Sequence, residues 1–282
     1  MNAKIERKGL ELNLQEIFSD FSSRGIDPQE VGFCDSATFL AAEREDPSYL
    51  EMYARYVDLR AYELEYLDWS ARVVPVVSKI LHEQLLETGR LGGCVDMSGI
   101  LSKTLDKCGI WNYCVKGSLT VEFPEGAGLE AQHYWTYDHG EFIAGHAWVV
   151  APPFNVIDLT VQQQPCPTAE RELLPAMVVQ PNLSLATFSV EDVVSDSIRL
   201  ALWQRGTRDE DVLRTIAPHF LAFSRNFVPR LHVTENGTRL KYVPVAIGGP
   251  DAPLEGISNM KFGTRTAHEV YMEIIAPRVA QL

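Results

Sequence analysis

The sequence predicts an α+β fold in which a helix that carries a cysteine packs on an antiparallel sheet, with helical additions at both ends. Three observations support this prediction. From about residue 10 to residue 109, apolar residues recur at steps of three and four, which is the spacing of a helix with one buried side. Between about residues 119 and 159, apolar and polar residues alternate as in half-buried strands. From about residue 189 the helical spacing returns.

Residues 1–75 are expected to form a helical extension packed on the core. The helical spacing is clearest over residues 10–18 and 49–57. A further helix is predicted to begin after Ser70, whose hydroxyl would cap its first turn, and to end at Gly89 in a left-handed conformation. Pro75 would then lie in the first turn or two of this helix, where a proline costs least.

Residues 76–185 are expected to form the core that carries the chemistry. A buried helix is predicted to begin at Cys94 and to stop at Gly109. Four strands of one antiparallel sheet are then predicted over residues 119–123, 133–137, 146–150 and 155–159. The polar segment 138–140 separates two of these strands. The proline-rich stretch 165–181 is the best candidate for a boundary after them.

Residues 186–282 are expected to form an α/β C-terminal extension that belongs to the same globule. Helices are predicted near residues 193–203, 209–223 and 268–279. A hairpin is predicted at residues 235–237, because an Asn-Gly pair tolerates the positive φ angles of a tight turn.

Composition argues against several classes of protein. Lys and Arg number 25 and Asp and Glu number 38, so the chain of 282 residues has a net charge of −13. A negative field repels phosphate backbones and anionic lipids, so neither nucleic acid nor a membrane is an expected partner. The charged N-terminus does not resemble a secretory signal, and the five cysteines follow no ordered spacing. We therefore expect a cytoplasmic protein or, alternatively, an effector exported without a cleaved signal.

Three residues form the strongest chemical pattern: Cys94 at a helix start, His146 at the start of a strand and Asp158 near the end of the next strand. A helix N-terminus stabilises a thiolate through its free N–H groups and its dipole. A neighbouring imidazole can hold the proton of the thiol and deliver it to a leaving group, provided that a carboxylate fixes its tautomer. Adjacent antiparallel strands would bring His146 and Asp158 to one face of the sheet.

Several neighbours are candidates for the rest of the site. The backbone N–H of Cys94 would be half of an oxyanion hole, and Gly93 leaves room for a substrate. Trp148 is expected to shield the imidazole and the carboxylate from water. Candidates for the second oxyanion donor are Trp111, Gln132 and Trp135.

Other reactive side chains have simpler interpretations. Cys108 and Cys114 are expected to fill the core, since no nearby His or Cys has the spacing of a metal ligand. His133 and His139 are expected at a strand surface and a turn, with contact to a substrate as the alternative. Asp96 is most simply a residue that favours the first turn of a helix.

The residues of this pattern resemble a known family. Segments 93–101, 108–110, 145–149 and 156–160 are similar to the core of the transglutaminase-like superfamily, and Gly145-His146-Ala147-Trp148-Val149 is the most specific part. The resemblance covers roughly residues 80–165. It implies a papain-like fold, in which a helix with a nucleophilic cysteine packs on an antiparallel sheet that bears histidine and aspartate. It also implies that Cys94 is the nucleophile, His146 the general base and acid, and Asp158 the orienting carboxylate.

The resulting hypothesis is a cysteine hydrolase that cleaves amide bonds of a peptide, protein or small acyl substrate through a thioester. It requires no cofactor and no metal ion. One alternative is acyl transfer by the same triad, either as a transglutaminase or from a thioester carrier to an amine. The other alternative is a catalytically inactive binding module of the same fold.

Overall fold

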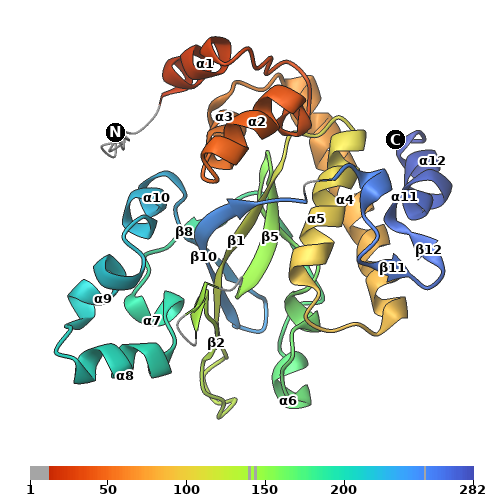
Figure 1. The fold of residues 1–282 in the computed structure, drawn as a ribbon. Helices are drawn as coiled ribbons and strands as arrows, with labels where there is room; N and C mark the ends of the chain where they lie inside the picture. Colours follow the sequence, from red (N-terminus) through yellow and green to blue (C-terminus); the bar gives the residue numbers. More distant parts are fainter. Residues whose placement is uncertain (1–12, 139–140, 143–144, 251) are drawn as a thin grey trace.

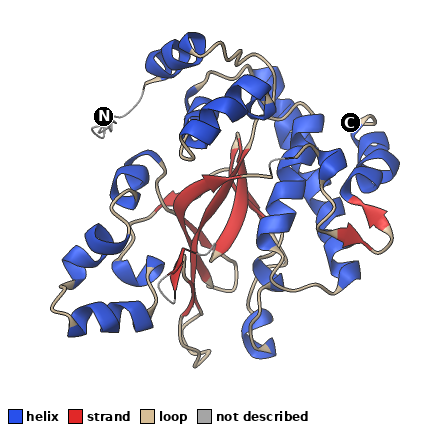
Figure 2. Cartoon of the chain, viewed as in Figure 1, coloured by secondary structure: helices blue, strands red, loops and turns tan. Residues whose placement is uncertain are grey.

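A curled antiparallel sheet lies at the centre of the chain, and helices pack around it (Figures 1 and 2). The structure is a computed structural model that describes residues 13–282 except 139–140, 143–144 and 251. The α+β class predicted from the spacing of apolar residues is confirmed. None of the described helices combines the length and the apolar content that a membrane span requires.

The main sheet, as far as it is described, has eight strands. Their order is β7-β6-β5-β1-β10-β9-β8, and β2 also pairs with β1. All of these pairings are antiparallel. The strands are β1 (Tyr113–Glu122), β2 (Gln132–Tyr134), β5 (His146–Ala151), β6 (Phe154–Asp158), β7 (Val178–Gln180), β8 (Ser184–Leu185), β9 (Arg230–Val233) and β10 (Arg239–Gly248).

The strand expected over residues 133–137 is divided in two. β2 ends at Tyr134, and Tyr137 begins a separate short hairpin of β3 (Tyr137–Asp138) and β4 (Glu141–Phe142). The hydroxyl of Ser118 on β1 accepts a hydrogen bond from the N–H of Thr136 and also bonds to its hydroxyl. The Ser118 side chain thus takes the place of a backbone partner from a neighbouring strand. Residues 139 and 140 of the predicted break, including His139, lie outside the described residues.

The N-terminal segment is helical, with α1 (Leu14–Ser23), α2 (Ala37–Glu45), α3 (Leu50–Leu59) and the 3₁₀ turn η1 (Phe33–Asp35). Asn13 and Glu16 form a capping box that begins α1. The helices enclose a cluster of aromatic rings in edge-to-face contact, which also holds the segment against β1 through Trp111.

Two long helices precede the sheet: α4 (Leu64–Thr88) and α5 (Cys94–Lys107). The predicted start of α4 after Ser70 is wrong, because α4 begins at Leu64, seven residues earlier, and Ser70 is buried inside it. Its hydroxyl donates to the carbonyl of Pro152 at 2.7 Å and so ties the helix to the β5–β6 turn. Pro75 therefore lies in the helix interior, between the buried Val74 and Val77, and packing outweighs the lost hydrogen bond. The predicted end holds, since Gly89 has φ 64°.

The C-terminal segment contributes both helices and central strands. β10 lies directly between β1 and β9, and the β9–β10 turn contains Gly237 with φ 89°, as the Asn-Gly pair predicted. The helices are α7 (Val190–Val193), α8 (Asp196–Gln204), α9 (Asp209–Ile216), α10 (Phe220–Asn226), α11 (Ala267–Val270) and α12 (Ala276–Val279). The single helix predicted near residues 209–223 is wrong, because residues 217–219 interrupt the helix and separate α9 from α10. The other helices lie close to their predicted positions, and the last one contains a π-helical turn over Tyr271–Ile275.

The remaining short elements connect these parts. They are η2 (Val161–Gln163), α6 (Thr168–Arg171), η3 (Leu254–Gly256), β11 (Lys261–Phe262) and β12 (Arg265–Thr266). The proline-rich stretch contains β7, which extends the main sheet beyond β6. The boundary placed after residue 75 falls within α4.

Each face of the sheet has its own apolar core. Helices α4, α5, α11 and α12 cover one face, on the right in Figure 1, and Val149 and Ile157 point into that core. The N-terminal helices and α7–α10 enclose the other core, which includes Trp148 and Val156. Because side chains alternate along a strand, His146 and Asp158 share the face of Trp148 and Val156.

Candidate active site

Cys94 is the first residue of α5, and Gly93 is its N-cap. The loop before it is held by a hydrogen bond from the N–H of Gly92 to the carbonyl of Gln163 at 2.9 Å. Gly92 has φ 69°, a conformation that L side chains rarely adopt. Cys94 is 5% exposed, so it is nearly covered. The prediction that Cys94 occupies the first turn of a buried helix is confirmed.

His146 begins β5 and lies against Asp158 at the end of β6. Its Nε2 is 2.6 Å from Oδ2 of Asp158, and neither side chain is exposed to solvent. The Nδ1 atom makes no hydrogen bond to any described residue, yet the thiol of Cys94 interacts with the ring. Because Asp158 occupies Nε2, Nδ1 is the nitrogen that remains available to the thiol.

Asp158 accepts hydrogen bonds from four donors. Oδ2 accepts from Nε2 of His146 and from the hydroxyl of Tyr242 at 3.0 Å. Oδ1 accepts from the N–H of Thr160 at 2.9 Å and from its hydroxyl at 3.1 Å. Burial raises the pKa of Asp158, but the imidazolium of His146 and the other donors outweigh burial and hold that pKa below its ordinary value. The carboxylate therefore stays ionised although it is buried.

The same contacts set the charge of His146. Burial lowers the pKa of the imidazole, whereas the carboxylate of Asp158 and the thiol of Cys94 raise it more strongly, to about 10. The imidazole is therefore protonated at neutral pH. Its positive charge lies beside the Cys94 thiol at the start of α5.

Packing by Trp148 and the close strand contact at Gly117 fix the position of the His146 side chain. The indole of Trp148 stacks on the imidazole, with ring centres 6.2 Å apart and planes at 28°, and packs edge-on against Tyr242. Gly117 of β1 lies opposite His146 in the ladder, next to a shift in the β1–β10 register. A Cβ atom at Gly117 would lie 2.2 Å from the carbonyl oxygen of Val243 and 2.7 Å from the indole. Only glycine leaves room for this arrangement.

The structure brings together Cys94, His146, Asp158, Gly93 and Trp148, but not the three candidates for a second oxyanion donor. The indole N–H of Trp135 donates to the carbonyl of Glu191 at 2.7 Å, and the amide of Gln132 donates to Glu170. Trp111 lies under the guanidinium of Arg60, within the N-terminal aromatic cluster.

Sequence reasoning missed Tyr242, Thr160 and Gly117. Thr160 had a usable signal, since a hydroxyl two residues after an aspartate often bonds to its carboxylate. Tyr242 lies 84 residues from Asp158 in the chain, and no local pattern connects the two. The role of Gly117 depends on packing between strands that are distant in sequence.

The structure also places the reactive side chains for which the sequence favoured a structural role. Asp96, in the first turn of α5, accepts hydrogen bonds from Arg90 and Asn259. His133 stacks on Trp135 with planes at 1°. Cys114 is buried, its thiol donates to the carbonyl of Ser98, and burial raises its pKa to about 11. Burial also raises the pKa of Cys108 to about 11.

A cavity of about 320 Å³ lies beside the first two turns of α5. Ala147, the neighbour of His146, and Asp96, two residues after Cys94, line it. Lys116 of β1 also lines it, and its ammonium makes no ion pair with any described residue. The remaining lining residues are Val95, Ser98, Gly99, Cys114, Gly249, Pro250, Ala252 and Gly256 to Asn259.

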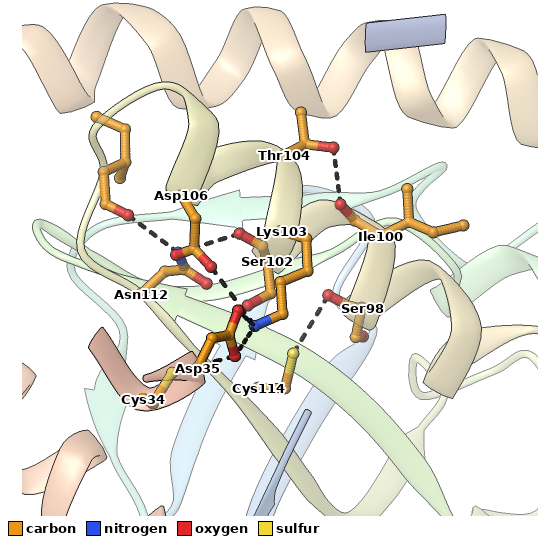
Figure 3. Close-up of polar contacts among 11 residues, drawn as sticks. Cys34, Asp35, Ser98, Ile100, Ser102, Lys103, Thr104, Asp106, Asn112 and Cys114 are labelled. Carbon is orange, nitrogen blue, oxygen red and sulfur yellow. Dashed lines mark hydrogen bonds and ion pairs between the residues drawn. The ribbon is translucent and has the colours of Figure 1, made fainter. Parts of the chain in front are cut away.

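A second polar cluster anchors the other end of α5 to the N-terminal segment (Figure 3). The ammonium of Lys103 bonds to both carboxylate oxygens of Asp35, at 2.6 and 2.7 Å, and lies 3.7 Å from Asp106. The amide of Asn112 donates to Asp106 at 2.8 Å. Burial and the charge of Asp35 raise the pKa of Asp106 to about 7, against the opposing effects of Lys103 and Asn112. This cluster fixes the helix that bears Cys94.

Comparisons with family models, curated proteins and solved structures gave no match. Within the described part of the chain, no group of three His, Cys, Asp or Glu residues is arranged to hold a metal ion. A function is therefore inferred from the geometry of the site.

Proposed function

We propose that the protein is a cysteine-dependent hydrolase that cleaves an amide bond of a peptide-like substrate through a thioester. One observation carries this proposal: a buried imidazole binds a buried carboxylate through Nε2 and also interacts with a thiol at a helix N-terminus. A helix that bears the thiol and an antiparallel sheet that bears the other two groups also favour a papain-like core. We assign the reaction to the cytoplasm, where the five thiols stay reduced.

Cys94, His146 and Asp158 act in both halves of the reaction, which are acylation of the thiol and release of the acyl group. The thiolate of Cys94 attacks the acyl carbon and forms a C–S bond, while the oxyanion accepts a hydrogen bond from the N–H of Cys94. As the C–N bond breaks, His146 gives its proton to the leaving amine. Neutral His146 then takes a proton from water, hydroxide attacks the thioester, and the thiolate leaves. Asp158 supports the imidazolium throughout.

Transfer of the acyl group to an amine is the second candidate. It is favoured by the burial of the triad, since Cys94 is 5% exposed and His146 is fully covered. A site with little water favours an amine over hydroxide as acceptor.

The test is a mass spectrum of the intact protein after brief exposure to p-nitrophenyl acetate and to a short peptidyl p-nitrophenyl ester at neutral pH. We expect one acyl adduct, located on Cys94 by peptide mapping and absent from Cys94→Ala. Cys166→Ala is the matched control, because Cys166 is a partly exposed thiol outside the triad. Adducts spread over several cysteines, or none on Cys94, would favour a binding module without catalysis.

The rate at which the adduct disappears separates the two chemistries. A hydrolase releases the acyl group at a rate that does not depend on added glycinamide or cadaverine. A transferase releases it faster as the concentration of the amine rises, and the acylated amine appears in the mass spectrum.

A further inference from the structure

A cavity of about 440 Å³ lies on the face of the sheet opposite α5. Residues of α3, of the β5–β6 turn and of the segment after α10 enclose it, and Trp148 and Val150 of β5 form part of its wall. Neither Cys94 nor any other residue of α5 lines it. Its volume lies in the range of small-molecule sites. It is therefore separate from the cavity beside the first two turns of α5.

Two arginines give this cavity an excess of positive charge. Arg230 lies near enough to Asp58 for their charges to attract, but its guanidinium makes no hydrogen bond and no direct ion pair with any described residue. Arg55 donates through Nη1 to the carbonyl of Asn226 at 3.2 Å, but its buried Nε has no partner in the described part of the chain. Asp58 is the one acidic residue in the described lining, and it already accepts a hydrogen bond from Tyr113 at 2.9 Å. The buried Nε of Arg55 therefore lacks an acceptor, which an anionic ligand in the cavity would supply.

Five aromatic side chains line the cavity together with aliphatic, proline and asparagine residues. Planar rings favour a planar, apolar partner that stacks on them or meets their edges. Arg55 also lies 6.0 Å from the ring of Phe227, so the cation and the aromatic wall are contiguous. The aromatic lining residues are Tyr62, Tyr113, Trp148, Phe154 and Phe227.

We propose that this cavity binds a small aromatic anion, with its ring between the aromatic walls and its anionic group on Arg230 and Arg55. The whole chain carries a charge of −13, so a local excess of guanidinium groups is a selective feature and not part of a generally basic surface. The proposal does not depend on the hydrolase activity, because no residue of the triad lines the cavity.

Isothermal titration calorimetry with 2-naphthoate tests the proposal, with 2-naphthamide as the neutral probe of the same shape. We expect naphthoate to bind the full chain and to bind it more tightly than naphthamide. Arg230→Gln should weaken naphthoate binding by about tenfold or more, since a hydrogen bond to a charged group contributes about 1.5–3 kcal/mol. Arg225→Gln is the matched control, because it removes the same charge from an exposed position on α10 that does not line the cavity.

A second variant covers the case in which Arg230→Gln does not fold. Val150→Phe leaves all charges in place and fills part of the cavity, so it should abolish naphthoate binding while the far-UV circular dichroism spectrum is unchanged. Equal affinity in the parent chain and in either folded variant would overturn the proposal. Equal affinity for naphthoate and naphthamide, or no binding of either, would also overturn it.

Discussion

Asp158 is the residue on which the geometry of the site depends most. Its two oxygens accept from His146, Thr160 and Tyr242, so the carboxylate cannot turn without breaking several hydrogen bonds. A buried carboxylate is costly unless such donors surround it. The hydroxyl of Tyr242 thus acts through Asp158 on the imidazole and makes Tyr242 a positioning residue.

Removing that hydroxyl should change both stability and the titration of the site. Tyr242→Phe is expected to cost about 1.5–3 kcal/mol, since it deletes a buried hydrogen bond to a charged group. With one donor fewer, Asp158 becomes a stronger base and a stronger acceptor, so the pKa values of Asp158 and of His146 both rise. The alkaline limit of acylation by the peptidyl ester should therefore move to higher pH, as a pH–rate profile would record.

Tyr62→Phe is the control for this experiment. It removes a hydroxyl that donates to the carbonyl of Val57 at 2.7 Å, far from the triad. Its pH–rate profile should match that of the parent chain. A profile of Tyr242→Phe that also matches the parent would show that the hydroxyl has only a structural role.

At the level of elements, the site depends on the contact of β1 with both β5 and β10. Gly117 lies opposite His146 in β5 and beside the register shift with β10, where it admits the indole of Trp148. The close contact with the carbonyl of Val243 is to backbone, which cannot move aside as a flexible side chain does.

Gly117→Ala should therefore destabilise the fold by about 1–3 kcal/mol, the usual cost of overpacking a core. Because the displaced indole no longer supports His146, acylation of Cys94 should slow as well. Urea denaturation and the acylation rate measure the two effects. Gly249→Ala is the control, since a Cβ there meets nothing within 4 Å, and it should alter the free energy of unfolding by less than about 1 kcal/mol.

Helix α5 links the site to the N-terminal segment through the cluster of Lys103, Asp35 and Asp106 (Figure 3). Asp106 has a folded-state pKa near 7, above its ordinary value of 3.8, because burial outweighs its favourable contacts. A group whose pKa is raised on folding contributes stability at low pH that is lost as the pH rises through the folded pKa.

The free energy of unfolding should accordingly fall as the pH rises from about 4 to 8. Asp106→Asn should abolish the part of this fall that comes from ionisation of Asp106. The asparagine can still accept from Asn112. Relative to the parent, the variant should gain about 1–2 kcal/mol between pH 5 and pH 8 in urea denaturation. Asp68→Asn, an exposed position on α4, is the control and should show no such gain. A difference that does not change with pH would contradict the role given to Asp106.

At the level of the whole molecule, local patterns predicted much of the fold. The change from helical spacing to alternation located α5, β1, β5 and β6. Gly89 predicted the end of α4, and Gly237 predicted the turn between β9 and β10. The start of α4 was missed because burial against Pro152, which no local pattern records, keeps Ser70 inside the helix. The contact of His146 with Asp158 followed from adjacent strands, whereas Tyr242 enters from a strand 84 residues beyond Asp158.

The central position of β10 in the sheet predicts that the first 185 residues do not fold without the C-terminal segment. The resemblance to a known family ends near residue 165, but β10 lies between β1 and β9 and supplies Tyr242. A chain truncated after residue 185 would expose the long edge of β1 and leave Asp158 with one donor fewer. It should not fold cooperatively, as circular dichroism during heating would show. A cooperative transition in the truncated chain would contradict this.

The rate at which iodoacetamide modifies each of the five thiols at pH 6, followed by mass spectrometry of the peptides, tests the central claim most directly. An ordinary thiol is only about 0.3% ionised at this pH, so a thiolate paired with an imidazolium should react at least about tenfold faster. The account predicts that Cys94 reacts first and that His146→Gln removes its advantage. If Cys94 reacts no faster than Cys166, or reacts equally fast in His146→Gln, the thiol and the imidazole do not act together.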